Sequence, residues 1–265
     1  MKKYIINEEK RHLSVHVGYA VWAASDGGGQ LGRRMKTEAG EELVPEICGD
    51  TAFSCRLPDG SRAVILSDGM GHGYAAAAES RAAAGLLRRL LKQGRPIAGA
   101  IKEVNRYLLE RSMRNGEKES YATVDLAVID QVSGRAKFYK MGAAPSYLVR
   151  GRRIRRIQQP ALPMGILPGI RLTHVSAKLA PGDIIVMMSD GISDSGWRRT
   201  CEGGQETFRE EDWIKSFLSE VIKNTSDKGK KAGPRQLARR LLEEAGHRYG
   251  NSEQDDATAV VIVIG

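Results

Sequence analysis

The chain has 265 residues, 41% of them hydrophobic, which is enough for the core of one large domain or two small ones. Its formal net charge of +9 favours acidic partners without selecting among nucleic acid, membrane and phosphoprotein. Three cysteines with no CxxC spacing argue against a disulfide framework and a zinc site, and no apolar run approaches the roughly 18 residues needed to span a membrane.

The first predicted element is a strand. Apolar residues alternate with small or polar ones from Val15 to Val21, which is typical of a half-buried strand, and the turn signal Asp26-Gly27-Gly28 follows it. Residues 1–12 are expected to form an N-terminal extension. Residues 30–46 are polar, contain glycine and show no clear period, so we expect a looped surface insertion there.

A hairpin and two helices come next. Strands are predicted from Asp50 to Leu57 and from Arg62 to Ser67, joined by the turn signal Pro58-Asp59-Gly60. The segment from Tyr74 to Gln93 is rich in Ala, Leu and Arg, which are strong helix formers. A second helix opens at Pro96 and places its apolar residues on one face.

The rest of the chain alternates hairpin-linked strands with two more helices. The predicted strands are Ala122 to Asp130, Arg135 to Met141, Ser146 to Val149, Ile154 to Gln158, Ile170 to Leu179, Asp183 to Ser189 and, last, Thr258 to Ile264. A helix containing Trp213 to Val221, a lysine-rich linker from Lys223 to Gly233 and a helix from Pro234 to Arg248 precede the final strand. Runs of hairpin-linked strands favour antiparallel sheets. We therefore predict a single α+β domain over residues 1–265, a four-layer αββα sandwich of two mainly antiparallel sheets flanked by helical pairs.

Acidic residues stand at the ends of three of these strands. Ser67-Asp68-Gly69 follows one apolar run, Ser189-Asp190-Gly191 follows another, and Asp255-Asp256 precedes the last. An unpaired aspartate at the end of a buried strand costs several kcal/mol. Three such ends that meet would repel one another unless a cation lay between them. The pattern therefore predicts a divalent metal held by carboxylates.

These motifs together resemble a known family. Gly49-Asp50, Ser67 to Gly73, Ser189-Asp190-Gly191 and Asp255 to Thr258 follow one another as in the metal-dependent Ser/Thr protein phosphatases of the PPM family. The closer resemblance is to the phosphatase domain of stage II sporulation protein E. Two segments support it, Lys140 to Ser146 and Leu162 to Ile166, and the likeness covers nearly the whole chain.

The resemblance implies two Mn²⁺ or Mg²⁺ ions and a set of residues that would hold them. Asp68 would bridge the ions, and Gly69 would ligate one through its carbonyl. Asp190 and Asp255 would ligate on the other side. Asp50 would hold a metal-bound water, so that Asp50, Asp68, Asp190 and Asp255 form the catalytic set. Asp194 would help to hold a third ion, and oxygen ligands alone suit such hard cations.

Four further features are singled out. His72 is a candidate proton donor to the leaving serine oxygen, and Arg33 and Arg34 are candidate phosphate ligands only through their closeness in sequence. The resemblance also implies that the two helices after Gly73 form a switch that moves the Asp68-Gly69 loop. The arginine-rich hairpin from Arg150 to Arg156 is either a solvated edge that blocks aggregation or a docking surface.

The function expected from the resemblance is hydrolysis of phosphoserine on a regulatory protein. By the same resemblance the substrate is a phosphorylated anti-anti-sigma factor in sporulation control. The alternative is a weakly active or inactive phosphoprotein-binding scaffold of the same fold. A nucleic-acid binder is not expected, because the basic residues are not interleaved with aromatic ones. The protein is expected in the cytoplasm, or at the cytoplasmic face of a membrane through regions absent from this chain, and the sequence leaves homodimer formation open.

Overall fold

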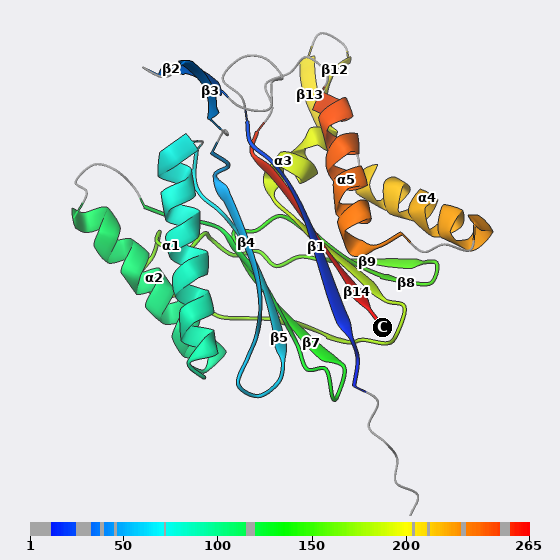
Figure 1. Cartoon of the computed structure of the whole chain (residues 1–265), viewed down its shortest axis with the longest axis horizontal. Coiled ribbons are helices and arrows are strands. Elements are labelled where there is room, and N and C mark those ends of the chain that lie inside the picture. Colours follow the sequence, from blue (N-terminus) through cyan, green and yellow to red (C-terminus); the bar gives the residue numbers. More distant parts are fainter. Residues whose placement is uncertain are drawn as a thin grey trace, which may run out of the picture.

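The fold is seen in a computed structural model of the chain (Figure 1). The residues that it describes are 12–24, 33–37, 40–44, 47–71, 73–114, 120–202, 205–210, 213–228, 232–249 and 255–265. The expected turn at Asp26-Gly27-Gly28, nearly all of the N-terminal extension and the candidate proton donor His72 lie outside these residues.

Two five-stranded sheets occupy the centre of the described part of the chain, and every pair of neighbouring strands within them is antiparallel. Sheet I has the order β1 (Val15–Trp22), β14 (Ala257–Ile264), β11 (Ile184–Met188), β8 (Ser146–Arg150) and β9 (Arg153–Ile157). Sheet II has the order β10 (Val175–Lys178), β7 (Arg135–Met141), β6 (Val124–Ile129), β5 (Arg62–Asp68) and β4 (Asp50–Arg56).

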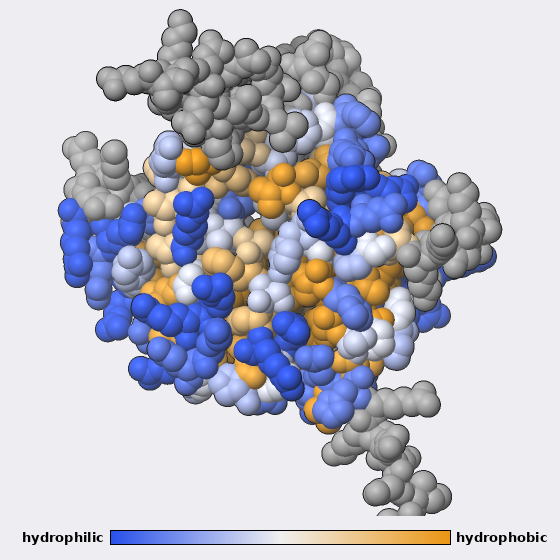
Figure 2. All heavy atoms as spheres, in the orientation of Figure 1, coloured by the Kyte–Doolittle hydropathy of each residue, from blue (hydrophilic) through white to orange (hydrophobic). Residues whose placement is uncertain are grey.

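A pair of helices covers the outer face of each sheet. Sheet II carries α1 (Gly73–Lys92) and α2 (Ile97–Arg114), and sheet I carries α4 (Trp213–Lys228) and α5 (Pro234–Tyr249) (Figure 1). Hydrophilic side chains cover the outer margins of both pairs, whereas apolar ones gather between them (Figure 2). The predicted αββα sandwich is therefore confirmed.

Three apolar layers hold the four structural layers together. The layer between the sheets contains Phe138 and Met187, the layer under α1 and α2 contains Ile65 and Leu87, and the layer under α4 and α5 is centred on Trp213. The strands β5 and β11 thus bury both faces over most of their length, as the apolar runs before Asp68 and Asp190 require. The acidic residues at the ends of these runs meet at one edge of the sandwich.

Two small ribbons depart from the sequence-based expectation. Residues 30–46 were expected to be a loop, but β2 (Arg33–Thr37) and β3 (Gly40–Val44) pair as an antiparallel ribbon. A second ribbon, β12 (Trp197–Glu202) with β13 (Gln205–Glu210), was not predicted at all. Both are isolated two-stranded ribbons, which need no buried face and so leave little periodic signal in the sequence.

Two predicted boundaries were also wrong. The linker was predicted to begin at Lys223, but α4 continues to Lys228, because a polar sequence can extend a helix into solvent. The strand predicted from Ile170 to Leu179 is limited to Val175–Lys178, since β7 pairs with it only over four residues.

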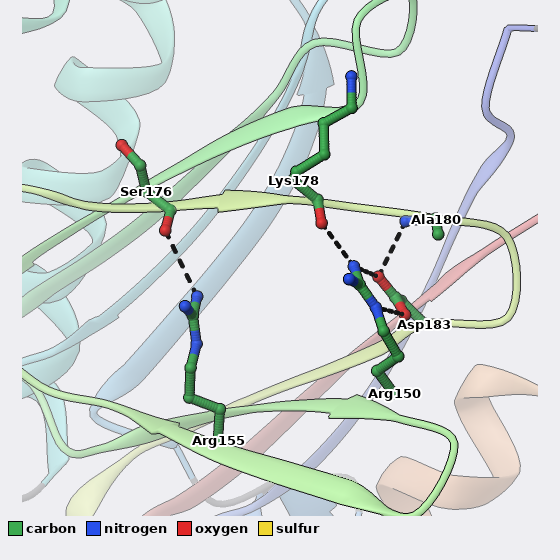
Figure 3. A network of polar contacts seen from close by, with 6 residues as sticks. All are labelled: Arg150, Arg155, Ser176, Lys178, Ala180 and Asp183. Atoms are coloured by element: carbon green, nitrogen blue, oxygen red, sulfur yellow. Dashed lines mark hydrogen bonds and ion pairs between the residues drawn. The ribbon is translucent and has the colours of Figure 1, made fainter.

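The arginine-rich hairpin is the β8–β9 edge of sheet I, and part of it ties the two sheets together (Figure 3). Arg150 donates to both carboxylate oxygens of Asp183, at 2.8 and 2.6 Å, and to the carbonyl of Lys178 in β10 of sheet II at 2.5 Å. Arg155 donates to the carbonyl of Ser176, also in β10, at 3.4 Å. Arg150 and Arg155 are therefore already engaged, and β9 is a charged edge strand of the kind that resists edge-to-edge pairing.

Candidate metal centre

Asp50 and Asp68 lie directly opposite each other at the site end of sheet II. Asp50 begins β4, Asp68 ends β5, and the two are partners in the antiparallel register. Opposite residues of such a pair have Cα atoms roughly 4.5–5.5 Å apart, so their side chains are neighbours when they share a face. The apolar register of β4 and β5 therefore brings two carboxylates together.

The backbone around Asp68 is fixed by hydrogen bonds and by close packing. Thr123 makes two hydrogen bonds to the backbone of Asp68. Its Oγ1 accepts the N–H of Asp68 at 3.1 Å, and its own N–H donates to the Asp68 carbonyl at 2.8 Å. A Cβ at Gly69 would lie 1.9 Å from the carbonyl oxygen of Ala76 in α1. Only glycine lets α1 approach this closely, so the position of the Asp68-Gly69 segment is coupled to that of α1.

Asp190 enters the site from sheet I. It begins the short helix α3 (Asp190–Ser193), which follows β11 and continues into the 3₁₀ turn η1 (Asp194–Gly196). Ser189 and Thr258 exchange hydrogen bonds of 3.0 and 2.8 Å, which fix the start of α3 against β14. The hydroxyl of Tyr249 donates to the Gly191 carbonyl at 2.8 Å and anchors α3 to α5.

The two acids before β14 have different surroundings. Asp255 is exposed, with one carboxylate oxygen accepting the N–H of Asp256 at 2.8 Å. Asp256 is only 3% exposed, and its two oxygens accept the backbone N–H groups of Ala24 and Gly49, each at 2.7 Å. Asp256 therefore serves to join β14 to the segments before β2 and β4, which leaves Asp255 as the acid available to a ligand.

The carboxylates from the two sheets raise one another's pKa. Burial is the main cause for Asp68, and the charges of Asp190 and Asp50 add to it, which together raise its pKa to about 9. Burial also raises the pKa of Asp190 to about 6, reinforced by the charges of Asp255 and Asp194. The structure thus brings all five predicted carboxylates into one electrostatic cluster.

Asp50 is the most deeply buried member of this cluster, at 8% exposure. Burial raises its pKa to about 7; the hydroxyls of Ser189 and Thr258 lie near enough to offset part of this rise, while Asp190 adds to it. Neither carboxylate oxygen of Asp50 completes a hydrogen bond of ordinary geometry in the described structure. Buried carboxylate oxygens are normally satisfied, so these two are suited to a water or an ion.

The donor set fits a hard divalent cation in chemistry, although its members are not assembled around one point. The groups are carboxylates together with the Gly69 carbonyl, which are ligands for Mg²⁺ and Mn²⁺. Among the described residues, however, no three His, Cys, Asp or Glu side chains lie close enough together to hold a metal ion. The acids are near enough to repel one another but too far apart to form a closed cage.

Two polar residues at the site were not singled out from the sequence as site residues. Asp125 of β6 lines the same small cavity as Asp68 and Asp190, and it is paired with the buried Lys140 of β7. Their positions in the period-two pattern carried a signal, because both share the inward face with Ala127 and Phe138. The candidate phosphate ligands Arg33 and Arg34 lie in β2, where only the backbone is described.

Comparison with solved structures gives the class of protein. The PP2C phosphatase domain of SpoIIE from Bacillus subtilis, solved with a fragment of its regulatory domain, superposes with a TM-score of 0.71 and 29% sequence identity, covering 96% of this chain and 64% of that one. RsbX, solved in complex with magnesium, shares the fold at a TM-score of 0.59 and 14% identity. The fold and the acidic cluster define this chain as a PP2C-type serine/threonine phosphatase domain.

Sequence comparison gives the family. The family model described as Stage II sporulation protein E (SpoIIE) matches residues 58–264. Stage II sporulation protein E of Bacillus subtilis (strain 168) is 33% identical over 218 residues, and that of Priestia megaterium is 33% identical over 215. This chain therefore belongs to the stage II sporulation protein E family.

The match covers the greater part of this chain but a minor part of the relatives. It includes 82% and 81% of the chain, yet only 24% and 33% of the two proteins. Within the described residues, no helix is both long and apolar enough to cross a bilayer.

Proposed function

We propose that this domain hydrolyses phosphoserine on a regulatory protein with the help of two Mn²⁺ or Mg²⁺ ions. The observation that supports this most strongly is the raised pKa of Asp50, Asp68 and Asp190, which come from both sheets with no cationic side chain among the causes of their shifts. A protein gains nothing in stability from such crowding. A divalent cation would convert the repulsion into binding energy.

The proposed ligands are distributed over both sheets. Asp68 and the carbonyl of Gly69 would hold ions from sheet II, Asp190 and Asp255 from sheet I, and Asp194 would assist a third. Bound there, the ions would lower the pKa of a water and neutralise the phosphoryl oxygens. The exposed position of Asp255 and the deep position of Asp50 would place the reacting phosphate at the open rim of the site.

Asp50 has a distinct part in the proposal. Burial raises the pKa of its carboxyl to about 7 in the metal-free cluster, and nearby divalent cations would lower it again, so with metal bound Asp50 is expected to be an ionised acceptor. Its two oxygens make no ordinary hydrogen bond within the described structure, so either can accept a proton from a water in the site. Asp50 would therefore hold and orient the attacking water and relay its proton.

The test is release of phosphate from a phosphoserine protein or p-nitrophenyl phosphate as a function of Mn²⁺ concentration. We expect metal-dependent turnover in the parent, loss of turnover in Asp190→Asn, and full turnover in Glu243→Gln. Glu243 is a suitable control because it lies exposed on α5, paired with Arg239 at 3.3 Å. Turnover that persists in Asp190→Asn would contradict the assignment.

The substrate proposed within the family is a phosphorylated anti-anti-sigma factor. Membership of the stage II sporulation protein E family supports it, and the net charge of +9 suits an acidic phosphoprotein. The test is dephosphorylation of such a protein compared with a phosphoserine protein of unrelated sequence. Equal rates on the two phosphoproteins at limiting substrate concentration would contradict the substrate assignment but not the proposed phosphatase reaction.

One observation favours a regulated or weakly active domain as the alternative. Three acidic side chains are not grouped closely enough to hold an ion in the described structure. We propose that α1 and α2 control their assembly. The backbone of α1 packs on Gly69, and Asn105 of α2 holds the N–H of Gly165 at 2.8 Å beside Met164, whose partner Ala122 pairs with Gly69.

Control by α1 and α2 predicts how the isolated domain should behave. Its affinity for metal should be weak and its basal activity low until α1 and α2 are held in place by a partner or another region. Saturation of the isolated domain at micromolar Mn²⁺ would contradict this. Absence of turnover at every metal concentration, together with retained binding of the phosphoprotein, would favour the scaffold.

A further inference from the structure

Three polar side chains are buried between the two sheets next to the acidic cluster. Lys140 of β7 donates to the carboxylate of Asp125 of β6 at 2.5 Å and to the hydroxyl of Ser146 of β8 at 2.9 Å. The Ser146 hydroxyl also donates to Asp125, at 2.6 Å. The side chains of Lys140 and Asp125 are 0% and 1% exposed. We call these three residues the buried triad.

The buried triad links one sheet to the other. Asp125 and Lys140 are direct partners in the register of β6 and β7, so both belong to sheet II and share one face. Ser146 is the first residue of β8 in sheet I. The three hydrogen bonds described above all join members of the triad to one another. Because hydrogen bonds are directional, they fix the distance between the two sheets at this point.

The position of the triad coincides with the site. Asp125 lines the same cavity as Asp68 and Asp190, and its remaining oxygen Oδ1 has no hydrogen-bond partner in the described structure. Asp125 is also the register partner of Leu66, two residues before Asp68. Lys140 and Ser146 flank the crossover that carries the chain from sheet II to sheet I, and residues 142–144 of that crossover line the cavity too.

Burial of an ion pair in a core carries a large desolvation cost. Most of the layer between the sheets is aliphatic or aromatic, and an apolar replacement of a buried ion pair is often neutral or stabilising. Stability therefore does not explain why a lysine and an aspartate lie here. Directional contacts do something that apolar packing does less well, which is to hold one geometry.

We propose that the buried triad is a positioning device that sets the distance between the Asp68 half of the metal site on sheet II and the Asp190 half on sheet I. The proposal rests on the function proposed above. Lys140, Asp125 and Ser146 act through the proposed ligands and do not themselves touch the substrate. Loss of the triad should therefore weaken metal binding more than it slows turnover at saturating metal.

The same strand β8 supplies a matched control. Ser146 begins β8 at the site end, and Arg150 ends it, where the Arg150 side chain reaches the Lys178 carbonyl of sheet II (Figure 3). Arg150→Met thus removes a link between the same two sheets from the same strand, away from the acidic cluster. The change in Mn²⁺ binding that it causes therefore reports what the loss of any contact between the sheets does, apart from closeness to the acidic cluster.

The experiment compares the parent with three variants. Ser146→Ala keeps the ion pair and removes its link to sheet I. The triple variant Asp125→Leu/Lys140→Met/Ser146→Ala removes all three polar groups, so that none is left buried without a partner. Arg150→Met is the control. For each, Mn²⁺ binding is measured by calorimetry and by the Mn²⁺-induced rise in melting temperature, and phosphate release is measured against Mn²⁺ concentration.

The expected result is a shift in metal dependence confined to the triad variants. The dissociation constant for Mn²⁺ should rise about tenfold in the triple variant, as is usual when groups that support metal ligands are removed, and less in Ser146→Ala. Turnover at saturating Mn²⁺ should largely recover. Arg150→Met should bind Mn²⁺ as the parent does, even where its melting temperature falls.

Two outcomes would overturn the proposal. One is Mn²⁺ binding equal to the parent in both Ser146→Ala and the triple variant. The other is a shift in Arg150→Met as large as that in the triple variant, since the effect would then follow stability alone. If the triple variant does not fold, Ser146→Ala decides. A parent that neither binds Mn²⁺ nor releases phosphate would instead refute the proposed function, and the positioning role with it.

Discussion

The two halves of the acidic cluster differ in how far they are removed from water. On sheet II, burial raises the pKa of Asp50 to about 7 and that of Asp68 to about 9. On sheet I, the pKa of Asp190 is raised only to about 6, and Asp194 and Asp255 are exposed. Burial alone does not set this order, because Asp50 is buried most deeply and yet has a lower pKa than Asp68. The hydroxyls of Ser189 and Thr258 offset part of the rise at Asp50, whereas the charges of Asp190, Asp50 and Asp255 add to it at Asp68.

This difference suggests an order of events for a binding ion. Asp190, with a pKa of about 6, is largely ionised at neutral pH, and its neighbours Asp194 and Asp255 are exposed, so this half can attract a hydrated cation first. Asp68 of the sheet II half, with a pKa of about 9, would lose its proton only when a cation is close.

The largest effect is expected for Asp68→Asn. Removal of the proposed bridging ligand should raise the activation barrier for metal-dependent phosphate release by several kcal/mol, which would slow the reaction on the order of a thousandfold. The metal-free domain should melt at a higher temperature than the parent, because the most strongly destabilised carboxylate is gone. Rates in excess Mn²⁺ and melting curves in chelator provide the measurements. Equal stabilisation by Asp190→Asn would show that the two halves do not differ.

The next effect concerns pH and metal removal. The three raised carboxyls bind protons in the native state at pH values where the unfolded chain, with carboxyl pKa near 3.8, has lost them. Stability of the metal-free domain should therefore fall as pH rises from about 4 to 9, by several kcal/mol in all, since each unit of pKa shift corresponds to about 1.4 kcal/mol.

Metal should reverse this trend. Saturating Mn²⁺ replaces the protons, so the rise in melting temperature that it causes should be larger at pH 8 than at pH 5. Thermal melts at both pH values with and without Mn²⁺ provide the test. A metal-free domain whose melting temperature climbs over this range would contradict the electrostatic account.

A smaller, separable effect is expected within the pair Asp255-Asp256. Asp256→Asn removes an ionised acceptor of two backbone N–H groups and should lower stability by about 1–3 kcal/mol. Asp255→Asn should leave stability nearly unchanged and lower metal-dependent turnover. Melting temperature and rate measured on both variants distinguish the two roles, and the reverse pattern would exchange the assignments.

The smallest effect is expected for Asp194→Asn. Asp194 is exposed, and an exposed charge is typically worth about 0–1 kcal/mol, which is up to about fivefold in binding. Turnover at limiting Mn²⁺ should fall by no more than this and should recover at high Mn²⁺. A loss as large as that of Asp68→Asn would place Asp194 among the principal ligands.

The sequence predicted the elements whose pattern is repeated along a buried face. The strand predicted from Arg135 to Met141 matches β7 at both ends, because its residues alternate against a packed core. The ribbon β12–β13 was missed because it belongs to neither large sheet. The end of α4 was missed because polar residues permit both a helix and a linker.

The acidic cluster was predictable for a similar reason. Each of Asp68, Asp190 and Asp255 borders an apolar run, so its place at a strand end could be inferred. The roles of Asp256 and Asp125 could not, because they depend on partners far away in sequence, such as Gly49, 207 residues from Asp256. Contacts of that kind arise from the packing of whole sheets.

The place of β14 in sheet I bears on how the domain is made. β14 lies between β1 and β11, so β1, near the beginning of the chain, pairs with residues that a ribosome adds last among the described strands. At about 5–20 residues per second, synthesis separates these two strands by on the order of ten seconds or more. Until β14 is made, β1 lacks its partner among the described strands, so sheet I can be completed only after the last of these strands has left the ribosome.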